Sequence, residues 1–62
     1  MKKQYYRAKE CAEYLGIGLS TFLRWVAEGQ IPEGYRLTAR ATVWNLKDIE
    51  SFVKSKPRSN HE

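Results

Sequence analysis

The sequence predicts a mainly α-helical domain with one small β-hairpin, and three observations support that prediction. First, apolar residues recur at helical spacing in residues 8–15 and again in residues 19–28, with a glycine-rich turn between them. Second, residues 35–44 are rich in β-branched and aromatic side chains, interrupted only by a two-residue turn. Third, residues 47–54 again show helical spacing and are followed closely by a proline.

Composition limits the classes of protein to which the chain can belong. The 62 residues suit one domain with a small core that relies on aromatic side chains, because so short a chain buries little surface. The single cysteine, Cys11, excludes an internal disulfide, and no Cys and His have the spacing of a metal site. We therefore expect a reduced, cytoplasmic protein that needs no cofactor, metal or small-molecule ligand. The basic start, residues 1–4, is not followed by an apolar run, so neither a secretory signal nor a membrane span is expected.

The charge balance favours an anionic partner. The net charge is +4, from 11 Lys and Arg against 7 Asp and Glu. Such an excess suits a polyanion, although many small domains carry it only for solubility. We expect a basic arm over residues 1–4, a folded domain over residues 5–54 and a flexible polar tail over residues 55–62.

Two helices joined by a tight turn open the domain. Residues 8–15 are predicted to form the first helix and residues 19–28 the second. In the turn, Gly16 stops the first helix, Ile17 supplies an apolar plug and Gly18 is the N-cap of the second helix. A three-residue turn favours a crossed helix-turn-helix pair over a plain helical hairpin.

The second helix divides into two arcs when it is plotted at 100° per residue. The broader arc is apolar and consists of Leu19, Phe22, Leu23, Trp25, Val26 and Ala27. The narrower arc is polar and consists of Ser20, Thr21, Arg24 and Glu28. Because so apolar a helix should be mostly buried, we expect the apolar arc to face the core. The polar arc then offers short hydroxyls and one arginine, which suits a DNA major groove; the alternative is an ordinary helix with a solvated face.

A hairpin over residues 35–44 and a third helix over residues 47–54 complete the domain. An isolated two-stranded hairpin is not stable in water, so Trp44 and Leu37 are expected to point inward and anchor it on the helices. The side chains expected on its outer face and tip are Arg36, Thr38 and Arg40. Residues 5–7 form a short extended segment that could pair with the hairpin. The inner face of the third helix is expected to consist of Ile49, Phe52 and Val53.

The order helix, turn, helix, hairpin, helix is the plan of a winged-helix DNA-binding domain. In that plan the second helix enters the major groove, and the hairpin reaches phosphates or the minor groove. The residues expected at base edges or nearby phosphates are Ser20, Thr21 and Arg24, with Gly18 at the start of the helix. Those expected at phosphates or in the minor groove are Arg36, Thr38 and Arg40. Charge that does not depend on DNA sequence would come from Lys2, Lys3, Arg7, Lys9 and the tail cations.

Four stretches of the sequence resemble one known family. They are residues 6–17 (YRAKECAEYLGI), 20–25 (STFLRW), 28–32 (EGQIP) and 44–52 (WNLKDIESF). Together they resemble the AlpA and excisionase group, small phage and prophage winged-helix proteins related to the DNA-binding domain of MerR regulators. The resemblance covers residues 5–54 and departs from the family pattern at Arg7 and Gly18, where many members have Ser or Thr. It implies DNA binding, often with bending, through the helix and hairpin residues named above. The long coiled coil of full MerR regulators does not occur in the sequence, so effector sensing is not expected.

The resemblance leads us to expect an excisionase, a recombination directionality factor that binds and bends attachment-site DNA to promote prophage excision. Its expected partners are double-stranded DNA, a phage integrase and further copies of itself, at the nucleoid of a bacterial or phage-infected cell. An AlpA-like transcriptional regulator would use the same surface. More distant alternatives are a terminase-like packaging protein and a protein-interaction adaptor whose basic face meets an acidic partner. An enzyme is not expected, because neither His61 nor Cys11 has an orienting partner nearby and no glycine-rich phosphate loop is present.

Overall fold

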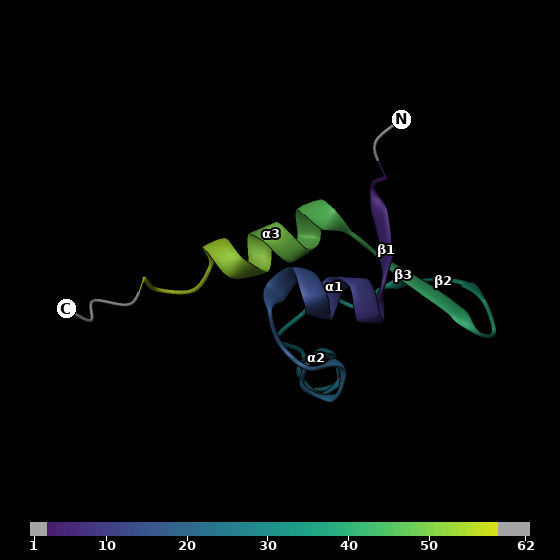
Figure 1. The fold of residues 1–62 in the computed structure, drawn as a ribbon, viewed down its shortest axis with the longest axis horizontal. Helices are drawn as coiled ribbons and strands as arrows, with labels where there is room; N and C mark the ends of the chain where they lie inside the picture. The colour runs from purple at the N-terminus through teal and green to yellow at the C-terminus, as the bar shows by residue number, and fades with distance from the viewer. Residues whose placement is uncertain (1–2, 59–62) are drawn as a thin grey trace.

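The computed structural model describes residues 3–58 and confirms a three-helix domain with a small antiparallel sheet (Figure 1). Its elements in chain order are β1 (Tyr5–Arg7), α1 (Ala8–Leu15), α2 (Leu19–Ala27), β2 (Tyr35–Thr38), β3 (Ala41–Asn45) and α3 (Leu46–Lys54). The arrangement is consistent with a winged helix-turn-helix, in which β2 and β3 form the wing. Lys2 and His61 lie outside the described residues.

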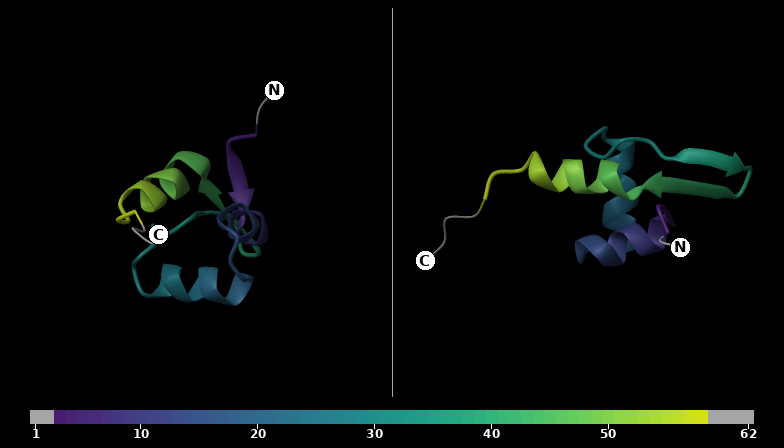
Figure 2. Two further views of the ribbon diagram at one scale, coloured as in Figure 1. Left: turned by 60° about the vertical axis from the view of Figure 1, so that its left-hand side comes forward. Right: turned by 90° about the horizontal axis from the view of Figure 1, so that it is seen from above.

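The turn between α1 and α2 forms as its glycines require. Gly16 has a φ of 74°, in the left-handed region that glycine adopts without a steric penalty. Its N–H donates to the Glu13 carbonyl at 3.1 Å, and the Ile17 N–H donates to the Ala12 carbonyl at 3.0 Å. Figures 1 and 2 show that α1 and α2 cross, so the helix-turn-helix prediction is confirmed over the plain hairpin.

The sheet has the strand order β1-β3-β2, with both pairs antiparallel. The predicted pairing of residues 5–7 with the hairpin is confirmed, because Tyr6 lies opposite Trp44. The hairpin extends beyond the helices as a two-stranded ribbon (Figure 2). An irregularity in the pairing lies between Arg36 and Thr38, close to its tip.

Trp44 holds the hairpin to the helices, as the sequence predicts. Its side chain is buried, and its ring packs edge-on against Phe22 with 5.0 Å between the ring centroids. Its Nε1–H donates to the Pro32 carbonyl at 2.8 Å, which satisfies the one polar group of the indole. The buried cluster around it consists of Cys11, Ala12, Phe22, Ile31 and Ile49. Ile17 packs against this cluster, as expected of the plug in the turn.

The predicted burial of α2 is wrong on one flank. Leu19 and Leu23 are 43% and 47% exposed, and Ala27 is also exposed. Phe22 is buried, whereas Trp25 and Val26 are only partly buried. The reason is the size of the domain: α1, the sheet and α3 cover only one side of α2, and the described residues supply no further layer for its other apolar flank.

Leu37 is also placed wrongly by the sequence analysis. It is 65% exposed, and Arg36, predicted on the outer face, lies on the side of the sheet that faces the helices. The strand pairing explains both, because side chains directly opposite each other point to the same face. Arg36 lies opposite Thr42, which shares a face with Trp44, so Leu37 must point the other way. Leu37 instead gathers on the outer face with Tyr5, Tyr35 and Val43.

The inner face of α3 is smaller than predicted. Ile49 is buried and Phe52 packs on the core, but Val53 is 46% exposed. Figure 1 shows the reason: the far end of α3 extends past α1 and α2. The helix begins at Leu46, and Asn45 caps it by accepting a hydrogen bond from the Lys47 N–H at 2.8 Å.

Candidate nucleic-acid interface

A cationic groove of about 720 Å³ lies between α2 and the hairpin. Of the described residues that line it, four are cationic and one, Glu33, is acidic. The cations are Arg7 at the end of β1, Lys9 in the first turn of α1, and Arg36 and Arg40 from the hairpin. Leu19, Leu23 and Val26 form the α2 side. A groove with this imbalance of charge attracts a polyanion.

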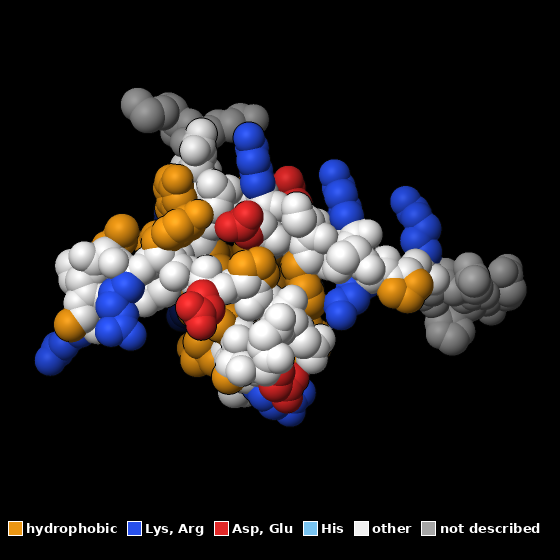
Figure 3. Space-filling view, turned by 180° about the vertical axis from the view of Figure 1, so that it is seen from behind, with side chains coloured by type: hydrophobic (Ala, Val, Ile, Leu, Met, Phe, Trp, Pro, Cys, Tyr) orange, Lys and Arg blue, Asp and Glu red, His pale blue; other side chains and the backbone are white. Residues whose placement is uncertain are grey.

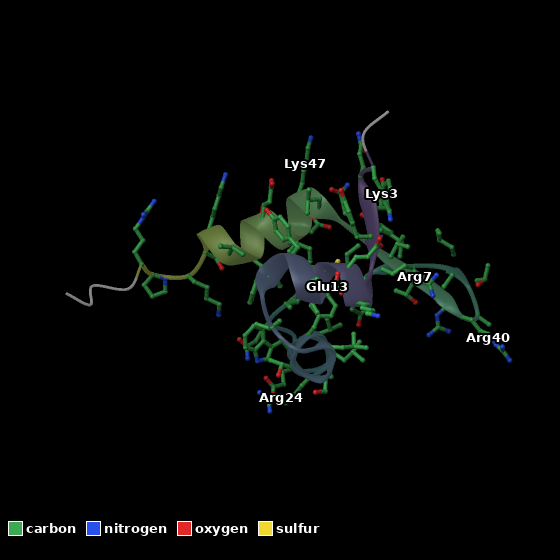
Figure 4. The ribbon with its side chains drawn as sticks, viewed as in Figure 1. Lys3, Arg7, Glu13, Arg24, Arg40 and Lys47 are labelled. Atoms are coloured by element: carbon green, nitrogen blue, oxygen red, sulfur yellow. The ribbon has the colours of Figure 1, made fainter. Side chains whose placement is uncertain are left out.

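The solvent-facing side of α2 carries the arginine that the sequence singles out. The Arg24 side chain is 64% exposed, and Figure 4 shows it projecting away from the core and away from the hairpin. Its Nε lies 3.9 Å from the Glu28 Oε2, one helical turn further on. An exposed pair of this kind contributes little to stability, so the guanidinium can leave Glu28 for another acceptor. Ser20 is exposed beside Arg24, whereas Thr21 is half-buried at the edge of the strip.

Two hydrogen bonds hold the tip of the hairpin. Arg7 Nη2 donates to the Arg40 carbonyl at 3.2 Å, and Thr38 Oγ1 accepts from the Arg40 N–H at 3.2 Å. The Arg40 side chain is left to project from the far end of the hairpin (Figure 4). Arg7 thus positions the hairpin in addition to contributing charge. Sequence analysis missed this role because the two residues are 33 positions apart and no local pattern links them.

Lys3 and Lys9, predicted as nonspecific contacts, lie in different surroundings. Lys9 lines the groove. Lys3 Nζ instead pairs with Glu10 Oε2 at 2.6 Å and lies 5.2 Å from the centre of the Tyr6 ring. Figure 4 places Lys3 beside β1, on the opposite side of the domain from Arg24.

The pKa of Glu10 reflects these contacts. The hydrogen bond from Lys3, followed by the hydrogen bond from the Arg7 N–H at 2.8 Å, lowers the pKa of the Glu10 carboxyl below its ordinary value of 4.5. The Glu10 carboxylate therefore caps the start of α1, which Arg7 itself cannot do. In this way it fixes the end of α1 from which Arg7 and Lys9 reach the groove.

Gly18 precedes the first residue of α2 and leaves the start of that helix open. It has no side chain to cap the helix, and a Cβ built on it would meet nothing within 4 Å. Of the ten predicted contact positions, the structure brings Lys9, Arg36 and Arg40 to one groove, with Ser20 and Arg24 on the neighbouring strip. Lys2 lies outside the described part of the chain.

Positive charge is not confined to this side of the molecule. The space-filling view from behind shows Lys and Arg side chains on the hairpin and along α3 as well (Figure 3). Lys47 projects from the start of α3, far from both Arg24 and Arg40 (Figure 4). The groove differs from α3 because its cations lie beside the exposed strip of a helix that follows a tight turn.

Comparison with known families settles the class of domain. A family model described as a helix-turn-helix domain matches residues 5–57, which is most of the chain. The chain belongs to this helix-turn-helix family. Comparisons with curated proteins and with solved structures each gave no significant match.

Family membership implies DNA as the partner of the domain. In helix-turn-helix domains the second helix of the motif is the recognition helix, and α2 has that place here. Within residues 3–58, no helix combines the length and the hydropathy needed to cross a membrane.

Proposed function

We propose that this helix-turn-helix protein binds double-stranded DNA sequence-specifically, with α2 in the major groove and the hairpin in the neighbouring minor groove. The observation that carries the proposal is the groove between α2 and the cationic hairpin, because the exposed strip with Ser20 and Arg24 lies directly beside it on the same helix. The phosphate strand that separates a major from a minor groove would lie between α2 and the hairpin. Arg36, Arg40 and Lys9 would then face phosphates, while Ser20 and Arg24 face base edges.

For the biological role we propose an excisionase that bends attachment-site DNA during prophage excision. The proposal rests first on the resemblance of residues 5–54 to the AlpA and excisionase group. It rests secondly on the projecting hairpin, because a hairpin that enters the minor groove commonly bends the DNA. One module of this size buries roughly 600–1,000 Å² of protein surface on DNA, so we infer that several copies bind together, with an integrase as a further partner. An AlpA-like regulator would use the same DNA-binding surface.

The test of sequence-specific binding begins with selection of a preferred duplex from a randomised library. We expect Arg24→Ala to reduce the preference for the selected over a scrambled duplex by roughly 1–3 kcal/mol, or about 5- to 150-fold, because it removes a bidentate contact to a base. Lys47→Ala is the matched control, since it removes an exposed cation from α3, and it should leave the preference unchanged. Equal weakening of Arg24→Ala on both duplexes would contradict the base-reading role.

Binding to attachment-site and promoter fragments separates the two biological roles. Bending measured by circularly permuted fragments, together with a ladder of complexes on attachment-site DNA, is the result expected of an excisionase. A single, unbent complex at a promoter would contradict that role and favour the regulator.

A further inference from the structure

Two leucines on the recognition helix are only partly covered by the described domain. Leu19 and Leu23 are 43% and 47% exposed, although both belong to an apolar arc that should be buried. They line the groove beside the hairpin, next to the strip that carries Ser20 and Arg24. Large apolar side chains gain free energy when they leave water, so a bound partner that covers them is favoured.

The surroundings of the two leucines indicate which partner covers them. The groove that they line has four cationic residues and one acidic residue, which suits an anion better than an apolar protein surface. Leu23 lies on the exposed flank of α2 next to the strip that carries Ser20 and Arg24, so a duplex contacted by Arg24 comes within reach of Leu23. On the major-groove edges of DNA, the apolar group is the C5-methyl of thymine.

We propose that Leu23, flanked by Leu19, reads the methyl group of a thymine close to the base that Arg24 contacts. This inference rests on the proposed DNA-binding function and adds a second base contact to the one proposed for Arg24. The methyl group contacts the exposed apolar flank of α2 at Leu23, while the cations of the groove face the phosphate strand beside it. Leu23 then disfavours cytosine, which has only a hydrogen at C5 and an amino group at C4.

The experiment replaces thymine with deoxyuridine, one position at a time, in the duplex selected from the randomised library. This change removes one methyl group and leaves base pairing intact. Wild-type protein should lose about fourfold in affinity at one position, which corresponds to about 0.8 kcal/mol for one buried methyl group. Leu23→Ala should bind the thymine duplex more weakly and lose nothing further with deoxyuridine at that position.

Two further variants keep the result interpretable. Leu23→Gln retains the length and helix propensity of the side chain and should behave as Leu23→Ala does. Agreement between the two variants shows that the weaker binding does not come from loss of the fold. Val53→Ala, at a residue that is 46% exposed on α3, should keep the wild-type response to deoxyuridine. Circular dichroism and melting curves for each variant establish that it is folded.

The outcomes separate the inference from the function on which it rests. If the selected duplex binds equally well with deoxyuridine at every thymine, or if Leu23→Ala responds as the wild type does, Leu23 does not read a methyl group. In either case the DNA-binding proposal stands. If no duplex is enriched from the library, the proposed function is wrong and the inference falls with it. If the leucines are instead covered by a protein, Leu23→Ala will bind the thymine duplex as tightly as the wild type, which also overturns the inference.

Discussion

Gly34 lies where the chain enters the hairpin, and we predict that Gly34→Ala destabilises the whole domain. A Cβ built on Gly34 would lie 2.6 Å from the Val43 carbonyl oxygen and 2.8 Å from both Thr42 Cγ2 and Trp44 Cε2. Such distances require atoms to move, and neither the backbone of β3 nor the buried indole can do so freely. Overpacking of this kind costs about 1–3 kcal/mol, and three short contacts place Gly34→Ala toward the upper end.

Part of this cost is offset, because alanine restricts the unfolded chain more than glycine does, by about 0.4–1 kcal/mol. The net loss is therefore about 2 kcal/mol. At roughly 4–8 °C per kcal/mol for a domain of this size, the melting temperature should fall by about 8–16 °C.

Thermal unfolding followed by circular dichroism measures the effect, with Gly18→Ser as the matched control. A side chain at Gly18 meets nothing within 4 Å and a serine there can cap α2, so the melting temperature should stay the same or rise slightly. A Gly34→Ala variant that melts within about 2 °C of the wild type would refute the close packing of this turn against Trp44.

Two further predictions concern charge. Arg40→Ala should weaken binding to every duplex and reduce the slope of log K against log salt concentration by about one unit, because one phosphate contact is lost. The control, Lys47→Ala, should leave this slope unchanged. An unchanged slope for Arg40→Ala would exclude the hairpin tip from the interface. Glu10→Gln should lower the melting temperature at pH values above 4.5, the ordinary pKa of the Glu10 carboxyl. The reason is that the folded state stabilises the charged carboxylate, which lowers its pKa and adds stability where the carboxylate is charged. The difference from wild type should shrink as the pH falls through that lowered pKa, and a difference that is constant between pH 7 and pH 3 would contradict the contribution of the Lys3 and Arg7 hydrogen bonds.

The parts of the fold that follow from local chemistry could be predicted from the sequence. The bounds of α1 follow from its apolar spacing and from Gly16, which adopts a left-handed conformation. The third helix, predicted over residues 47–54, follows from its apolar spacing and starts one residue earlier, at Leu46; the strands of the hairpin follow from β-branched and aromatic residues on either side of a two-residue turn. Each of these features depends on residues close together in the chain.

The faces of the elements were harder to predict, because they depend on distant parts of the chain. A helical projection separates the apolar from the polar arc of α2, but it cannot tell which part of a wide apolar arc so small a domain can cover. Leu19 and Leu23 are exposed for that reason. In the hairpin, burial of Trp44 fixes which side chains face the helices as far as the pair Arg36 and Thr42, and Leu37, next to Arg36, points to the opposite face.

The candidate interface shows the same division. Arg24 and Arg40 could be singled out because each lies in a short segment with a recognisable local structure. The hydrogen bond from Arg7 to the Arg40 carbonyl and the groove that joins α2 to the hairpin required the tertiary structure.

An NMR titration of the 15N-labelled protein with the selected duplex tests the central claim most directly. If α2 and the hairpin hold DNA between them, the largest amide shift changes will fall on residues 18–24 of the recognition helix and on residues 36–40 of the hairpin. The amide of Lys47 on α3 will move little. Changes centred on α3, with those of α2 and the hairpin unaffected, would contradict the assignment of the DNA-binding surface.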